Sequence, residues 1–234
     1  MILVRIMPVL EFLTSSGFGS LLGMRHALEP DHLAAVSTLV SRERNGAKAA
    51  LLGACWGLGH TAGLVVVGSV LVLLRAELPP RLADVFELFV AIMLIVLGSR
   101  SVLQALRQAD ARHSHHRWFA MHTHSGLAAH VHVGTWTLAR RPLIVGAIHG
   151  LAGSGALTAL VLTTLPSTLA RLTYMALFGL GSTLSMAALS GLLGWPLARL
   201  GAHSGVTRGI SMAVGVMSVA LGLYWGYPLV GRIF

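Results

Sequence analysis

Residues 23–36 read Gly-Met-Arg-His-Ala-Leu-Glu-Pro-Asp-His-Leu-Ala-Ala-Val. Two histidines, two acids and one arginine lie here inside an apolar run that is long enough to enter a lipid bilayer. Ionisable side chains at membrane depth are costly, so they usually face a cavity or the path of a substrate. The stretch therefore predicts a functional site inside a membrane-spanning segment. The alternative is a kinked structural helix whose charges pair internally.

The composition of the whole chain is that of a polytopic membrane protein. Of 234 residues, 55% are hydrophobic and 11% are charged, against roughly 25% charged in a soluble domain. The net charge is +9, and the basic residues lie mostly between the apolar runs. In that position lysine and arginine set the orientation of a protein in the lipid bilayer, so we expect no nucleic-acid partner. A single cysteine, Cys55, excludes a disulfide within the chain and any CxxC motif. Six apolar segments are predicted as membrane helices: residues 8–40, 47–74, 84–106, 143–165, 169–197 and 206–229.

The first of these segments is too long for one perpendicular helix. At about 1.5 Å per residue it would extend roughly 50 Å, whereas the hydrocarbon core is about 30 Å thick. We expect a break near Pro30, which has no N–H to donate to the carbonyl of His26. On an unbroken helix Asp31 and His32 would point about 140° and 240° away from His26. Unwinding would bring the three together and would release the His26 carbonyl as a further ligand.

The two halves of the chain repeat one another. Three short motifs recur in order with offsets of 122 to 124 residues. Each unit has three predicted spans, an odd number, so the second unit must be inverted relative to the first, as in many secondary transporters. The predicted organisation is a first repeat (1–106), a connecting loop (107–142) and a second repeat (143–234). The recurring motifs are Gly23-x-x-His26-x-Leu28 with Gly146-x-x-His149-x-Leu151, Gly57-Leu58-Gly59-His60-Thr61 with Gly179-Leu180-Gly181-Ser182-Thr183, and Leu97-Gly98 with Leu221-Gly222.

The basic residues predict the orientation of the spans. Connections after the first, third and fifth segments hold ten lysines and arginines, and the opposite side holds five. The side richer in lysine and arginine is usually cytoplasmic. We therefore expect a multi-pass protein of the cell membrane with both termini outside and the loop 107–142 in the cytoplasm.

The residues His26, Asp31 and His32 form the pattern His-x4-Asp-His, and His60 follows in Trp56-Gly57-Leu58-Gly59-His60-Thr61. Both motifs resemble those of the nickel/cobalt transporter family, most closely its six-span branch of urease-accessory-type nickel permeases. The resemblance implies that His26, Asp31, His32 and His60 bind the transported metal. Two features depart from the larger members: six spans instead of eight, and Glu29-Pro30 where many of those members have Asp-Ala.

The second repeat retains only part of this pattern. His149 occupies the position of His26, while Ser154 and Gly155 stand where Asp31 and His32 would be. We predict a transport-pathway role for His149, Ser154 and Ser182. For His149 a packing hydrogen bond is an equal alternative.

Ligand chemistry limits the choice of ion. Imidazoles with one carboxylate suit Ni²⁺, Co²⁺, Zn²⁺ or Cu²⁺, whereas Cu⁺ prefers sulfur and Mg²⁺ prefers several carboxylates. Nickel and cobalt are selected by the family resemblance. Arg25, which is always cationic, receives no metal role, and we expect it to pair with Glu29 or another acid.

A histidine-rich stretch lies in the central loop. Such tracts often bind metal loosely, so we predict a cytoplasmic metal buffer, against the alternative of a solvated linker. A cytoplasmic metal acceptor protein is a candidate partner. The seven histidines are His113, His115, His116, His122, His124, His130 and His132.

The sequence thus predicts a permease that moves nickel, with cobalt as a second candidate, into the cytoplasm. The ion is the substrate, no resident cofactor is expected, and the protein is not predicted to be an enzyme. No GxxxxGK[ST] motif is present, so coupling to an ion gradient or to the membrane potential is expected. The alternatives are an efflux permease for the same ions and, with less support, a membrane metalloenzyme, whose HxxxH or HxxHH boxes are absent.

Overall fold

The computed structural model describes residues 17–41, 43, 45–110, 130–133, 136–165, 167–200 and 204–234. Most of these residues are helical, as predicted. A helical segment over residues 17–26 comes first. The helices that follow are α2 (Pro30–Val40), α3 (Gly46–Leu74), α4 (Pro80–Asp110), α5 (Arg140–Thr164), α6 (Thr168–Leu200) and α7 (Ser204–Ile233).

Four stretches of helix are long and apolar enough to cross a membrane, judged by length and composition among the described residues. They are Gly46–Leu74 in α3, Pro80–Arg107 in α4, Thr168–Pro196 in α6 and Gly205–Ile233 in α7. The large apolar side chains exposed along them include Val66, Leu73, Leu184 and Leu223. Such a surface is what a helix presents to lipid.

The predicted break in the first apolar run is present. The helical segment ends at His26, residues 27–29 form a turn, and α2 starts with Pro30 in its first turn and Glu29 as its N-cap residue. Proline suits this position because the first N–H groups of a helix have no helical acceptor. The His26 carbonyl makes no helical bond to residue 30, which is a proline, and it accepts the backbone N–H of Glu29 at 3.0 Å instead. A turn bond thus replaces the helical one.

The ends of α3 are set by local chemistry. The Asn45 side chain accepts hydrogen bonds from the N–H groups of Ala47 and Lys48 at 2.9 and 3.2 Å, which satisfies two donors at the helix start. At the other end Arg75 adopts a left-handed conformation with φ 52°, and the chain leaves the helix there.

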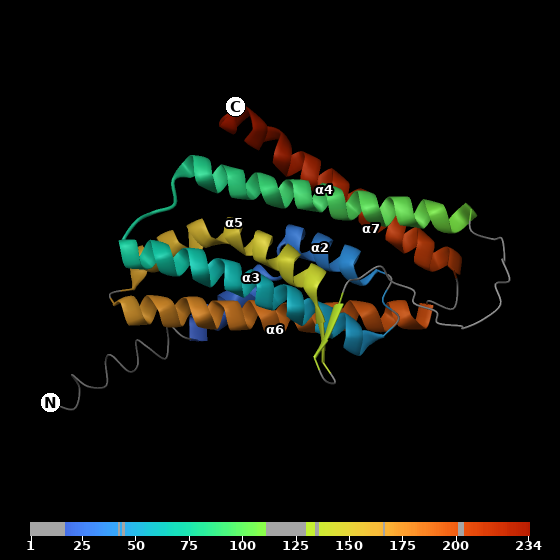
Figure 1. Cartoon of the computed structure of the whole chain (residues 1–234), viewed down its shortest axis with the longest axis horizontal. Coiled ribbons are helices and arrows are strands. Elements are labelled where there is room, and N and C mark those ends of the chain that lie inside the picture. The colour runs from blue at the N-terminus through green and yellow to red at the C-terminus, as the bar shows by residue number, and fades with distance from the viewer. Residues whose placement is uncertain are drawn as a thin grey trace.

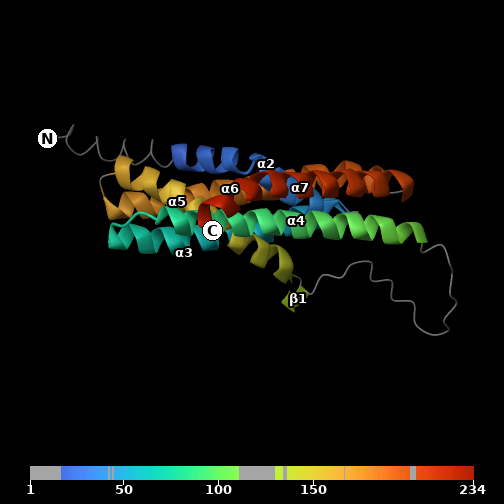
Figure 2. The ribbon, with the colours of Figure 1, turned by 90° about the horizontal axis from the view of Figure 1, so that it is seen from above.

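The long helices lie side by side in two groups. Helix α3 packs against α5 and α6, and α4 packs against α7. Short α2 lies between the groups and contacts α3, α4, α6 and α7 (Figure 1). The view from above also shows the long helices running lengthwise (Figure 2). The larger apolar cluster, which includes Val36, Trp56, Leu94 and Met186, joins α2 to α3, α4 and α6.

Glycines bring the backbones of α3 and α5 into direct contact. A side chain at Gly59 would collide with the carbonyl of Leu143, and one at Gly150 would collide with the carbonyl of His60. Small residues at helix interfaces permit this close approach in membranes. The contact holds His60 and His149 next to each other on facing helices.

A two-stranded antiparallel sheet departs from the predicted all-α fold. Strands β1 (His130–Val133) and β2 (Trp136–Ala139) pair with His130 opposite Ala139 and Val133 opposite Trp136. β-branched and aromatic residues at these positions favour extended backbone. The hairpin leads directly into α5.

Candidate metal centre

Five ionisable residues meet where the first helical segment, α2, α3 and α5 converge. His26 ends the helical segment, Asp31 and His32 lie in the first turn of α2, His60 lies midway along α3, and His149 lies in α5. His32, His60 and His149 are almost fully buried, and Asp31 is buried as well. The break before Pro30 is what lets residues 26 and 32 face the same point, because it changes the direction of the chain between them.

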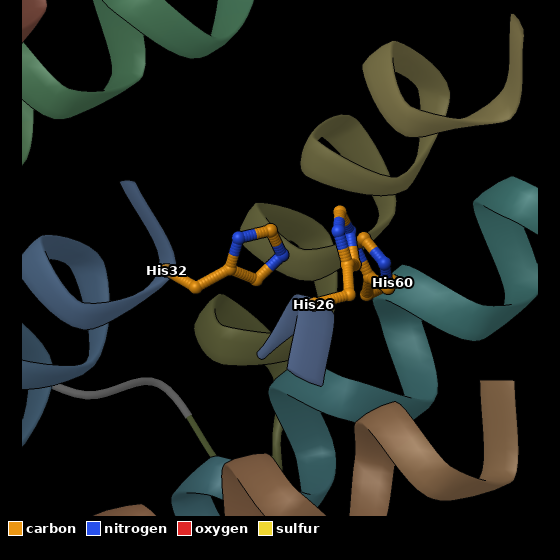
Figure 3. Close-up of side chains that lie close together, drawn as sticks. All are labelled: His26, His32 and His60. Atoms are coloured by element: carbon orange, nitrogen blue, oxygen red, sulfur yellow. The ribbon is translucent and has the colours of Figure 1, made fainter. Parts of the chain in front are cut away.

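Three of the histidine rings face one another (Figure 3). The ring centroids of His26 and His32 are 4.4 Å apart, and each lies 5.3 and 5.2 Å, respectively, from the ring of His60. Each ring has one nitrogen that lies within 4.8 Å of a nitrogen of both other rings, so three nitrogens from three residues form a compact group. Metal–nitrogen bonds are about 2 Å long, so nitrogens sharing an ion lie no more than about 4 Å apart. A small inward movement of the rings would bring them to that distance.

Several nitrogens of these rings have no hydrogen-bond partner among the described residues. They are Nε2 of His26, Nε2 of His32 and both ring nitrogens of His60. A buried polar atom without a partner costs roughly 1–3 kcal/mol. Groups left in this state in a native fold are often partnered by a water or an ion. The donor set therefore fits a transition-metal ion bound by imidazole nitrogens.

Asp31 joins the remaining histidine to this group. Its Oδ1 lies 3.0 Å from Nδ1 of His32, and its Oδ2 lies 2.7 Å from Nε2 of His149. Asp31, His32 and His149 also form a second set of three residues close enough to hold a metal. His32 belongs to both sets.

A cavity of about 1370 Å³ opens onto the cluster. His26, Asp31, His32 and His149 line its inner part, and Glu87 of α4 with Arg232 of α7 belong to the same lining. Arg232 also pairs with Asp84 at 3.2 Å, which ties the end of α7 to the start of α4. Because Arg232 is exposed, the cavity connects the buried histidines with the surface at that end of the helices.

Glu29 has a different partner from the one predicted. Its carboxylate lies 3.0 Å from Nδ1 of His26, so it pairs with this histidine. The partner expected from the sequence was Arg25. Arg25 lines the cavity. The sequence separation explains the result, because residues 26 and 29 face each other across the turn that ends the first helical segment.

The other predicted site residues are serines of α5 and α6 and histidines of the central loop. Ser182 in α6 is fully buried, and its hydroxyl contacts the sulfur of Met186 at 4.0 Å. Ser154 lies in α5, but its side chain lies outside the described part of the chain. His130 and His132 lie in β1. The remaining loop histidines, His113, His115, His116, His122 and His124, lie outside the described residues.

Sequence reasoning did not assign two aromatic rings to the site. Phe178 of α6 lies 5.3 Å from the ring of His26, and Trp56 of α3 lies 5.7 Å from the ring of His149. His26 and His149 are separated by 123 residues, and Trp56 and Phe178 by 122. The repeat alignment makes Trp56 and Phe178 equivalent positions, so the two contacts correspond to each other, but the alignment alone does not place either ring beside a histidine.

These features are those of a polytopic helical membrane protein with a buried histidine–aspartate cluster reached by a cavity. No protein-family model matches the chain, and no solved structure matches it. UreH, a urease accessory protein of Bacillus sp. (strain TB-90), is 30% identical over 223 residues, which is 95% of each chain. The protein belongs to the family of this urease accessory protein.

Two plant proteins are more distant relatives. The chloroplast proteins FOR GROWTH AND FERTILITY 1 and 2 of Arabidopsis thaliana are 29% and 26% identical over 189 and 186 residues. The matches cover 78% and 79% of this chain but only 50% and 48% of those proteins. The chain therefore corresponds to about half of each plant protein.

Proposed function

We propose that this protein is a permease that carries Ni²⁺, with Co²⁺ as a second candidate, across the cell membrane into the cytoplasm. We place the ion among His26, Asp31, His32 and His60. The observation that supports it most directly is the convergence of unpaired, buried imidazole nitrogens at the inner end of a cavity. A transition-metal ion would partner one nitrogen of each ring.

The family relationship supports nickel over the other ions that imidazoles bind. Imidazole sites bind Cu²⁺ at least as well as Ni²⁺, so ligand type alone does not select nickel. UreH is a urease accessory protein, and the His-x4-Asp-His motif resembles that of urease-accessory-type nickel permeases. Selection among divalent ions then depends on how closely the three rings approach one another when the ion binds.

Six spans in two inverted repeats are the architecture we propose for this activity. Contacts between equivalent positions support it. An added side chain at Gly57 would meet Cα of Thr183 at 2.7 Å, and one at Gly179 would collide with the side chain of Thr61. The hydroxyls of Thr61 and Thr183, which are equivalent in the repeat, lie 2.9 Å apart. Such reciprocal contacts are what a twofold axis between inverted units produces.

The position of the cavity and the distribution of basic residues support transport of the ion into the cell. The cavity opens near the end of α7, on the side with fewer basic residues, which we assign to the exterior. A divalent cation entering a negative interior gains about 4.6 kcal/mol per 100 mV. On the opposite side, we propose that the loop 107–142 buffers the ion in the cytoplasm, before transfer to an acceptor protein.

Uptake of labelled nickel tests the proposal. Cells that express wild type should accumulate nickel above cells with an empty vector, and excess cobalt should compete more strongly than zinc. His26→Ala should abolish the uptake. His203→Ala, which removes a histidine with no assigned role, is the matched control and should retain it. Accumulation below that of the empty vector would indicate efflux instead. Equal accumulation in wild type and His26→Ala would contradict the assigned site.

A further inference from the structure

The two acids of the turn before α2 each face the same atom of a histidine. Glu29 lies 3.0 Å from Nδ1 of His26, and Asp31 lies 3.0 Å from Nδ1 of His32. In both rings the other nitrogen, Nε2, is buried and has no partner among the described residues. Glu29 thus contacts His26 and Asp31 contacts His32, each through Nδ1, and Nε2 of each ring stays without a hydrogen-bond partner among the described residues.

These contacts determine the protonation of the neutral rings. An ionised carboxylate only accepts hydrogen bonds, so the imidazole nitrogen facing it must donate. His26 and His32 therefore carry their proton on Nδ1 and have a lone pair on Nε2. A metal ion binds such a lone pair. Without the carboxylates, either nitrogen of each ring could carry the proton.

Asp31 uses both of its oxygens in this way. Oδ1 faces His32, and Oδ2 faces Nε2 of His149 at 2.7 Å. Each carboxylate oxygen therefore already faces a histidine, whereas Nε2 of His26, Nε2 of His32 and both ring nitrogens of His60 have no partner among the described residues. His26, His32 and His60 also form a set of candidate ligands to which Asp31 does not belong.

We propose that Glu29 and Asp31 are positioning residues that direct Nε2 of His26 and His32 toward the ion, and that Asp31 itself does not bind it. This inference rests on the proposed function. The ion is held by three imidazoles, and the two carboxylates lie one bond further out, where they orient the rings and raise their basicity. His149 fixes Asp31 from the opposite side and is likewise outside the ligand set.

This arrangement suits an ion that must leave again. A site on a transport path has to bind strongly enough for entry and weakly enough for release. Three neutral imidazoles bind a divalent ion without neutralising its charge. The carboxylate of Asp31 offsets that charge from a distance, and Glu29, which is half-exposed and lines the cavity, does so at the entrance.

Metal binding by the purified full-length protein tests the proposal. X-ray absorption of the Ni²⁺-loaded protein counts the imidazole ligands, infrared difference spectra detect carboxylates that become metal-bound, and calorimetry measures affinity. Wild type should have three imidazole ligands and no newly metal-bound carboxylate. Glu29→Gln and Asp31→Asn should keep three imidazoles, with affinity lowered about 10- to 100-fold. Glu77→Gln, an exposed acid away from the cavity, is the matched control and should bind as wild type.

The outcomes separate this inference from the proposed function. Metal-bound carboxylate bands in wild type that disappear in Asp31→Asn would show direct ligation by Asp31 and overturn it. Affinity of Glu29→Gln equal to wild type would also overturn it, and because Glu29 is half-exposed that variant is expected to fold. Failure of wild type to bind Ni²⁺ or Co²⁺ would remove the proposed function and this inference together. Normal binding by three imidazoles with no effect of either acid would remove only the inference.

Discussion

Gly153 offers the most specific test of the ion site, because a methyl group added there reaches the histidines without disturbing the helices. Its Cβ in Gly153→Ala would lie 3.6 Å from Nε2 of His26 and 4.0 Å from Cε1 of His60. Both are ordinary van der Waals distances, and no backbone atom lies among the nearest neighbours. Alanine also favours helix over glycine by up to about 1 kcal/mol. The folded protein should therefore be obtained at wild-type yield.

The cost of this methyl group appears only when an ion is bound. Three imidazoles leave positions on the ion for water, and a water needs about 30 Å³. A methyl carbon 3.6 Å from the ligand nitrogen takes part of that space. Losing one such polar contact costs roughly 1–2 kcal/mol, which corresponds to about a five- to thirtyfold increase in the apparent KM for nickel.

Initial rates of labelled nickel uptake over a range of nickel concentrations measure this effect, with transporter abundance determined by immunoblot of membranes. Gly209→Ala is the matched control, because its added Cβ would have no neighbour within 4 Å. Its KM should equal that of wild type. A wild-type KM in Gly153→Ala, at equal abundance, would refute the placement of the ion between His26 and His60.

Three further outcomes are expected. His32→Ala and His60→Ala should each abolish nickel uptake with expression retained, measured by uptake and immunoblot; normal uptake in both would contradict the site. Gly150→Ala should lower stability by about 1–3 kcal/mol, because its methyl collides with the His60 carbonyl; an unchanged Tm in detergent would argue against close α3–α5 contact. Replacing the seven loop histidines by serine should leave uptake intact but reduce growth at high nickel; near-complete loss of uptake would instead indicate a permeation role.

Hydropathy located the helices well but not their ends. Residues 169–197 were predicted as a span, and the helix is Thr168–Leu200; residues 84–106 were predicted, and the helix is Pro80–Asp110. An apolar run marks the part of a helix that suits lipid, whereas the helix itself continues through polar residues until a cap or turn stops it. The β1–β2 hairpin was missed although His130–Val133 alternates polar and apolar residues as a strand does, because these histidines were assigned to a metal-binding loop.

The sequence predicted that His26, Asp31 and His32 lie close together, but it did not predict which atoms of the cluster contact one another. The cost of charge in an apolar run singled out His26, Asp31 and His32, and Pro30 indicated the break. The partner of Asp31 on α5 depends on how two distant helices pack, which no local pattern specifies. The repeat placed His149 opposite His26, but only the folded chain brings it within 2.7 Å of Asp31.

The contact between Thr61 and Thr183 makes two residues of the same type chemically unequal. A hydroxyl group has one proton, and Thr61 donates its own to the carbonyl of Gly179 at 2.8 Å. The 2.9 Å contact must then use the proton of Thr183. Two threonines 122 residues apart in the sequence thus differ where they meet: one donates and the other accepts. Even with identical surroundings, the two threonines would be chemically distinct at this contact, because only one of the two hydroxyls can donate in it.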